Sequence, residues 1–175
     1  PFMELYPDAK RWYTITGQYV FGESLLRNTV DVVKELGGQH VGNSYHSLSD
    51  REYSGYITAA LAAEPDVLAI CNFGNQTLDV LRQAVSFGMK SNTKILVVWS
   101  AGLDQFQAWG TQTIEDGYFG ANYWHGVDRP GNALLRKEFE AVHKKVPNYL
   151  NATGWAVMQM MVTGMNKAGT TEVPQ

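Results

Sequence analysis

Four aromatic residues hold the positions in this chain of 175 residues where a ligand could bind. They are Tyr19, Phe21, Phe73 and Trp99. Each follows an apolar stretch with the composition of a strand, and ligands of parallel α/β sheets sit beyond the carboxyl ends of the strands. Apolar walls with few polar groups are typical of small-molecule sites. We therefore predict a shared ligand wall, with a structural alternative in which the rings only close that end of the core.

Motifs for chemistry are weaker than this aromatic pattern. The segment from Gly17 to Ser24 has the glycine spacing of a phosphate-binding loop, but Glu23 stands where the lysine should be. A carboxylate at that position would repel a phosphate. The segment from Val98 to Gly102 lacks the first glycine of a nucleophile elbow, so Ser100 is expected to be a turn residue.

Other catalytic or metal-binding arrangements are equally weak. Asp104 and Asp116 could form an acid–base pair, although loop carboxylates are usually solvated. The four histidines have no metal-ligand spacing. We therefore expect no catalytic residue, no metal and no cofactor, and binding is favoured over chemistry.

The composition of the chain limits the kinds of partner that it is expected to bind. The chain is 45% hydrophobic and 18% charged with a formal net charge of −3, which is ordinary for a globular domain and argues against nucleic acid. No apolar stretch approaches the roughly 20 residues that span a bilayer. The single cysteine, Cys71, lies in an apolar strand and is expected to be a buried hydrophobe.

Strands alternate with helices over the first two thirds of the chain. Predicted strands are Arg11–Thr16, His40–Tyr45, Val67–Cys71, Lys94–Val98 and Gly117–Trp124. Predicted helices are Glu23–Leu36, Arg51–Ala63, a helix between Asn75 and Gly88, Leu103–Trp109, Asn132–Val146 and Thr153–Lys167. This order predicts an α/β fold: a three-layer, Rossmann-like parallel sheet with extra C-terminal helices.

Helix ends carry local signals. Ser49 and Glu52 match a capping box for the helix that follows them. Asn75 is expected to cap the next helix, and Gly88 stands where a left-handed residue would end it.

Four segments, in this order and spacing, are similar to one protein family. They are Gln18–Ser24, Asp66–Lys90, Glu115–Tyr118 and the helix start near Pro147–Trp155 followed by Ala168 and Gly169. The chain resembles the type I periplasmic binding proteins, in the branched-chain amino-acid (leucine/isoleucine/valine) branch of ABC-transporter receptors.

The resemblance implies a non-enzymatic receptor with two lobes joined by hinge strands. Residues 1–123 would be the second ligand-binding lobe, and residues 124–175 would be post-hinge helices that pack on the missing first lobe. The implied partners are a small-molecule solute and the membrane permease of an ABC transporter, with no nucleic acid. The implied location is the periplasm, and we expect an export signal peptide outside this fragment.

The resemblance also suggests the ligand. Phe21 and Phe73 match pocket tyrosines without their hydroxyl groups, and Trp99 stands where amino-acid-binding members place a glutamate. A buried ammonium group without a counter-charge is costly. Asp104 is the nearby candidate acid, so the predicted ligand-binding residues are Tyr19, Phe21, Phe73, Trp99 and Asp104. We expect an apolar or aromatic ligand, such as an aromatic carboxylate.

Two other functions remain open from the sequence. One is a cytoplasmic ligand-sensing regulator of the same fold, which an absent export signal in the complete protein would favour. The other is an α/β hydrolase that uses Asp104 or Ser100.

Overall fold

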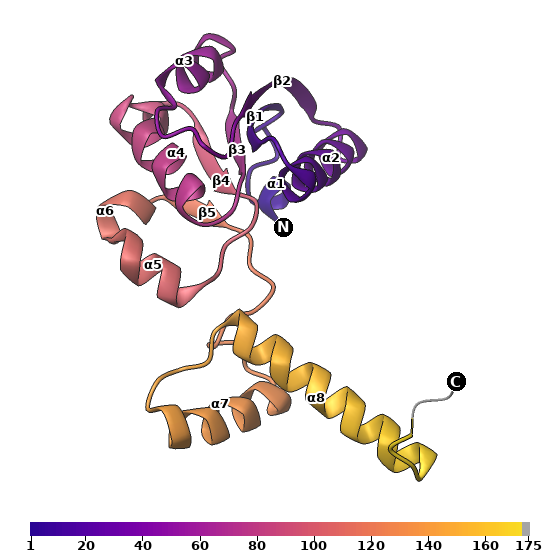
Figure 1. Cartoon of the computed structure of the whole chain (residues 1–175). Helices are drawn as coiled ribbons and strands as arrows, with labels where there is room; N and C mark the ends of the chain where they lie inside the picture. Colours follow the sequence, from indigo (N-terminus) through magenta and orange to yellow (C-terminus); the bar gives the residue numbers. More distant parts are fainter. Residues whose placement is uncertain (173–175) are drawn as a thin grey trace. The chain divides into compact units, whose positions relative to one another are not determined.

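The computed structural model describes residues 1–172 and contains two compact units. The sheet unit consists of Pro1–Ser100 and Gln105–Ala121. The helical unit consists of Ala101–Asp104 and the chain from Asn122 onward. Figure 1 shows the sheet and its covering helices in the sheet unit, and the two helices that follow them along the chain in the helical unit.

A five-stranded parallel sheet forms the centre of the sheet unit, with strand order β2-β1-β3-β4-β5. The strands are β1 (Arg11–Gly17), β2 (Gln39–His46), β3 (Val67–Cys71), β4 (Lys94–Val97) and β5 (Gly117–Phe119). This sheet and its flanking helices confirm the predicted α/β, Rossmann-like fold of a type I periplasmic binding protein lobe. All the strand pairs are parallel, so the carboxyl ends of the strands meet at one edge.

Side chains alternate between two cores, one on each face of the sheet. In β3, Leu68 and Ile70 point into the larger core and Val67 and Ala69 into the smaller one. All four are fully buried, which explains the continuous apolar run in the sequence. In Figure 1, α2 lies on one side of the sheet and α3 and α4 on the other.

The sheet unit holds most of the helices. They are α1 (Phe2–Leu5), α2 (Val20–Glu35), α3 (Ser54–Ala62), α4 (Asn75–Ser86), the 3₁₀ turn η1 (Met89–Ser91), α5 (Leu103–Trp109, which begins in the helical unit) and α6 (Thr111–Ile114). Helix α2 begins three residues before the predicted start. Gly88 has φ +74° just after α4, as expected for a left-handed residue that ends a helix.

The predicted capping box is wrong. Helix α3 begins at Ser54, and the amide of Ser54 donates to Glu52 Oε1 at 2.8 Å. The amide of Tyr53 donates to Gln83 Oε1, from α4, at 2.7 Å. Glu52 does not reach back to the Ser49 amide, which donates to Ser47 Oγ at 3.3 Å, and a tertiary contact to Gln83 satisfies an amide at the observed start of the helix. The expected cap of α4 also differs, because Gly74 is the N-cap and Asn75 is the first helical residue.

Strand β5 ends at Phe119, five residues before the predicted end at Trp124. Gly120 follows it and runs against β4: a Cβ on Gly120 would lie 2.1 Å from the carbonyl oxygen of Val98. The amide of Gly120 still donates to Val97 at 2.8 Å. Beyond Ala121 the chain enters the helical unit, so aromatic composition overstated the length of the strand.

The helical unit contains α7 (Pro130–His143) and α8 (Tyr149–Ala168). Helix α8 begins at Tyr149, four residues before its predicted start. Asn148 caps it in a complete capping box with Asn151. Within residues 1–172, no helix combines the length and the apolar character needed to cross a bilayer.

Candidate functional site

Three aromatic rings from different strand ends meet in the sheet unit, and we call them the ring cluster: Phe21, Phe73 and Trp99. The ring centroids of Phe73 and Trp99 are 5.0 Å apart. Phe21 lies edge-on to both, at 6.0 Å from Phe73 and 5.9 Å from Trp99. Tyr19 flanks the cluster, with its ring centroid 6.1 Å from that of Phe21. The structure thus brings together four of the five predicted site residues.

The cluster is accessible rather than part of the core. Phe21 is 37% exposed and Phe73 is 44% exposed, while Tyr19 and Trp99 are half-buried. Aromatic pairs in edge-to-face contact keep a defined geometry. An exposed, mutually packed set of rings offers a preformed apolar surface to a ligand, whose binding to these residues remains a prediction.

Phe21 owes its position to a close approach of backbone to backbone. Helix α2 begins at Val20, immediately after the extended Tyr19. Two residues later, a Cβ on Gly22 would lie 2.1 Å from the carbonyl oxygen of Gly17 and 3.2 Å from that of Cys71. Only glycine fits there, so the first turn of α2 sits directly on the ends of β1 and β3.

Trp99 is followed by a fixed turn. The amide and the hydroxyl of Ser100 donate to the carbonyl of Gly120 at 2.7 and 2.9 Å. Ser100 is fully buried, and its hydroxyl is engaged in this contact. This geometry suits a structural turn that anchors Trp99, and it differs from the exposed serine of a nucleophile elbow.

Asp104 belongs to the helical unit, in the first turn of α5. Its Oδ2 accepts a hydrogen bond from Asn148 Nδ2 at 2.8 Å, so the carboxylate ties α5 to the cap of α8. Its role toward a ligand stays a prediction. Asp116, its suggested acid–base partner, lies in the other unit and has φ +56°.

Burial shifts the pKa values of two side chains near the ring cluster. It raises the pKa of the Tyr19 hydroxyl and raises the pKa of the Cys71 thiol to about 12. Cys71 therefore stays protonated at neutral pH and is no nucleophile. Among residues 1–172, no group of three or more His, Cys, Asp or Glu side chains could hold a metal ion.

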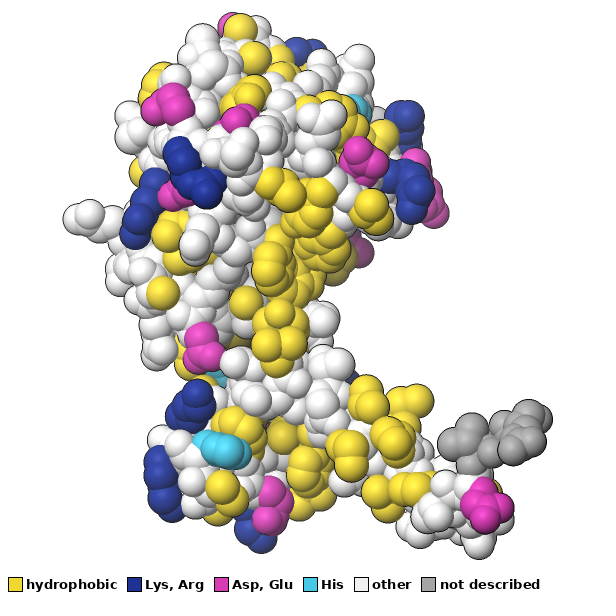
Figure 2. All heavy atoms as spheres, viewed as in Figure 1, with side chains coloured by type: hydrophobic (Ala, Val, Ile, Leu, Met, Phe, Trp, Pro, Cys, Tyr) yellow, Lys and Arg dark blue, Asp and Glu magenta, His cyan; other side chains and the backbone are white. Residues whose placement is uncertain are grey.

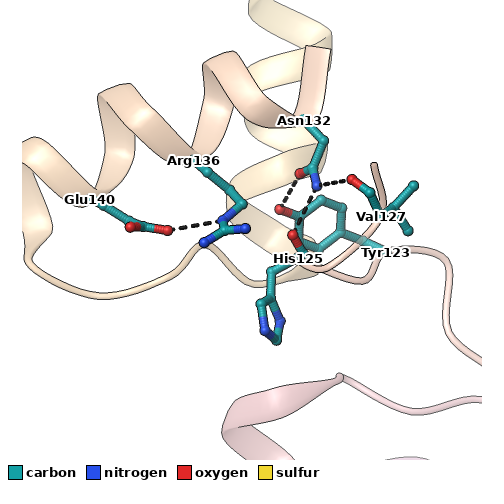
Figure 3. Close-up of polar contacts among 6 residues, drawn as sticks. All are labelled: Tyr123, His125, Val127, Asn132, Arg136 and Glu140. Carbon is teal, nitrogen blue, oxygen red and sulfur yellow. Dashed lines mark hydrogen bonds and ion pairs between the residues drawn. The ribbon is translucent and has the colours of Figure 1, made fainter. Parts of the chain in front are cut away.

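Sequence reasoning missed two polar arrangements. In the helical unit, Asn132 binds the loop before α7: it accepts from the Tyr123 hydroxyl at 2.7 Å and donates to the carbonyls of His125 and Val127 at 2.9 and 2.7 Å (Figure 3). In the sheet unit, His46 Nε2 lies 2.9 Å from Asn72 Oδ1. Neither has a local sequence signature, because each joins residues that meet only in the fold.

The fold of this chain is similar to the folds of several solved ABC-transporter binding proteins. An amino acid ABC transporter substrate-binding protein from Pseudomonas fluorescens Pf-5 is 50% identical, with a TM-score of 0.91 over 97% of this chain and 46% of that one. A solute-binding protein from R. palustris, solved in complex with benzoate, shares the fold at 19% identity, with a TM-score of 0.77 over 97% of this chain and 46% of the other. A leucine-binding protein from Thermotoga maritima MSB8 also shares it, at 19% identity and a TM-score of 0.73 over 98% of this chain and 49% of the other.

The chain thus spans about half the length of these solved structures. The comparison with curated proteins finds no match. The family model described as periplasmic binding protein matches residues 5–175. Together with the parallel sheet and its strand order, this match shows that the chain belongs to the periplasmic binding protein family.

Proposed function

We propose that the sheet unit is the second lobe of the solute receptor of an ABC importer, and that the ring cluster is its half of the ligand site. The observation that carries this proposal is the meeting of three rings at the carboxyl edge of the sheet, with Phe21 and Phe73 exposed. Ligands of open α/β sheets bind at that edge. The mechanism is closure of two lobes on the ligand, which stabilises the closed arrangement because it contacts both.

The ligand we propose is apolar or aromatic, and a carboxylate is the best candidate. The three rings supply an apolar surface and no charge, and an amino-acid ammonium group would need a carboxylate partner. Asp104, the predicted acid, is already bound to Asn148. That a protein of the same fold was solved with benzoate makes benzoate a natural first probe, and the amino-acid relative makes leucine the natural comparison.

The helical unit would complete the receptor by packing on the first lobe. Large apolar side chains of α8 are exposed, and Figure 2 shows hydrophobic side chains along this helix. They are Leu150, Val157, Met158, Met160, Met161 and Val162. Such a surface is typical of an interface within a protein. The complete receptor would work outside the cytoplasm with a membrane permease, and without catalysis.

The test is titration calorimetry of the complete receptor with benzoate and with leucine. Phe73→Ala and Trp99→Ala should each weaken binding by about 1–3 kcal/mol, the scale of a lost buried ring contact. Phe87→Ala is the matched control: Phe87 lies at the other end of α4 and is 45% exposed, against 44% for Phe73.

Equal affinities for all three variants would refute the ring cluster as the site. Preference for leucine over benzoate would refute the proposed ligand class and leave the receptor role standing. Hydrolysis of ester or amide substrates that is lost on Ser100→Ala would refute the receptor role itself.

A further inference from the structure

Three residues, His46, Gly17 and Asn72, form a row across the carboxyl ends of β2, β1 and β3. Gly17 of β1 pairs with His46 of β2. On the other side of β1, Thr16 pairs with Cys71, the last residue of β3, so Asn72 comes next to Gly17. Strand β1 lies between the other two, and only the middle residue of the row has no side chain.

His46 and Asn72 meet over this glycine. His46 Nε2 lies 2.9 Å from Asn72 Oδ1, and both residues are buried, at 1% and 0% exposed. A Cβ on Gly17 would lie 3.3 Å from Asn72 Oδ1, inside ordinary contact distance. The contact therefore joins two strands that have no ladder hydrogen bonds to each other.

The far side of the imidazole is also fixed. Nδ1 lies 2.9 Å from the carbonyl oxygen of Ser47, which can only accept, so Nδ1 carries a hydrogen. Nε2 of the neutral ring is then an acceptor, so its contact with Asn72 is a hydrogen bond when the Asn72 amide presents its NH2 group to Nε2. The ring of Tyr53, from α3, stands edge-on at 5.0 Å. Packed and bonded from two directions, His46 is a rigid support for Asn72.

This pair adjoins the ring cluster by two routes. Asn72 immediately precedes Phe73, so its side chain fixes the backbone from which that ring projects. The Tyr19 ring covers Gly17, where an added Cβ would lie 2.9 Å from Tyr19 Cε1. The bridge therefore touches the supports of two predicted site residues.

Stability alone does not account for the bridge. Among the described residues, the buried Asn72 amide has a hydrogen-bond partner at the end facing His46 and none at its other end, and an unsatisfied buried polar atom destabilises a fold. An apolar pair would fill the same space without that cost. A directed contact, however, holds its partners in one geometry.

We propose that His46 and Asn72 are positioning residues of the ligand site: their bridge over Gly17 fixes the strand ends that carry Tyr19 and Phe73. The inference rests on the proposed function for its effect on affinity, but its effect on the rings is independent of any ligand. Neither side chain needs to touch the ligand.

The experiment uses the complete receptor labelled with 5-fluorotryptophan, with the Trp99 resonance assigned by Trp99→Phe. Trp99 reports the position of Phe73 because their rings are 5.0 Å apart. His46→Ala and Asn72→Ala should each shift or broaden this resonance in the unliganded protein. Each should also weaken binding of the benzoate probe about tenfold at temperatures well below melting, and the double variant should be no weaker than the single ones.

The control is His40→Ala. His40 lies on the same strand, half-buried, and its Nε2 contacts Thr14 Oγ1 at 2.9 Å, but it lies near the opposite end of β2. It should leave the Trp99 resonance and the affinity unchanged.

A Trp99 resonance that stays in place in both bridge variants, with only the melting temperature lowered, would overturn the inference. If one variant does not fold, the other decides. If the unmodified receptor binds neither benzoate nor leucine, the proposed ligand fails while the resonance still tests the bridge.

Discussion

The sheet unit and the helical unit bury their apolar residues very differently. Among residues 1–172, Leu135 on α7 and Pro147 are the buried apolar residues of the helical unit, and the others all lie in the sheet unit. Helix α8 buries none of its 20 residues. The sheet unit thus supplies its own core, whereas the helical unit has well-formed helices and little core of its own.

Local signals explain how helices can be well formed without a core. Helix α8 has a complete capping box at Asn148 and ends at Gly169, with φ +68°. Helix α3, buried at Ile57 and Ala60, has no side-chain cap. Capping defines where a helix starts and stops, and burial against a partner decides how stable it is.

Separating the two units should produce the largest effect. A fragment of residues 1–121 should keep its sheet and unfold cooperatively on heating, because both cores lie within it. A fragment of residues 122–172 should lose helix gradually, without a cooperative transition. Circular dichroism melting of both fragments checks this, and a cooperative transition in the second fragment would remove the contrast.

Truncating one side chain in each unit should show the same contrast between a unit with a core and a unit with little core. Ile70→Ala removes a fully buried side chain of the larger core and should lower the free energy of unfolding by about 2–5 kcal/mol. Measured on residues 1–175 alone, Met160→Ala removes a side chain that is 74% exposed on α8 and should change this free energy by less than about 0.5 kcal/mol. Urea denaturation measures both, and comparable losses would mean that α8 is buried in solution.

Removal of the α8 cap should have a moderate effect. Asn148→Ala deletes the side chain that accepts from the amides of Leu150 and Asn151, and should cost the helix about 0.5–2 kcal/mol. The same change at Asn166, exposed near the end of α8, is the control and should cost nothing. Hydrogen exchange of the first turn of α8 distinguishes them. Unchanged protection in the Asn148 variant would show that contacts other than the cap hold this turn.

The smallest effect concerns the loop between β2 and α3. A hydrogen bond from the Tyr56 hydroxyl, with one from the Ser47 amide, holds the pKa of Asp50 below its ordinary value of 3.8. Because this pKa is lower in the folded state, the carboxylate stabilises the fold above that ordinary value, and this contribution is lost as the pH falls through the folded pKa.

Tyr56→Phe should therefore raise the pKa of Asp50 toward 3.8, as followed by NMR titration. The pKa of Glu52, which is lowered chiefly by the Ser54 amide, should not move in the same variant. A pKa of Asp50 that stays low without the Tyr56 hydroxyl would assign the shift to the Ser47 amide instead.

Sequence patterns predicted the parts of the fold in which local composition and burial agree. The bounds of β3 were predicted correctly because both of its faces are buried. A strand buried on both faces is apolar at every position, as the run from Val67 to Cys71 is. The meeting of Phe21, Phe73 and Trp99 followed from topology alone, since parallel strands bring their carboxyl ends together.

The errors arise where a distant residue replaces a local signal. Ser49 and Glu52 have the spacing of a capping box, but α3 begins later, at Ser54, where Gln83 from α4 accepts from the amide of the N-cap residue Tyr53. The bridge between His46 and Asn72 had no local signal, because it depends on the register of three strands.

The contact of Gly22 with the carbonyl of Gly17 has a consequence for specificity. Main-chain atoms set the location of position 21, so the backbone contact that fixes this position does not involve the phenyl ring. Under the proposed function, a change of the side chain at position 21 would alter the surface offered to a solute without altering the backbone platform that carries it.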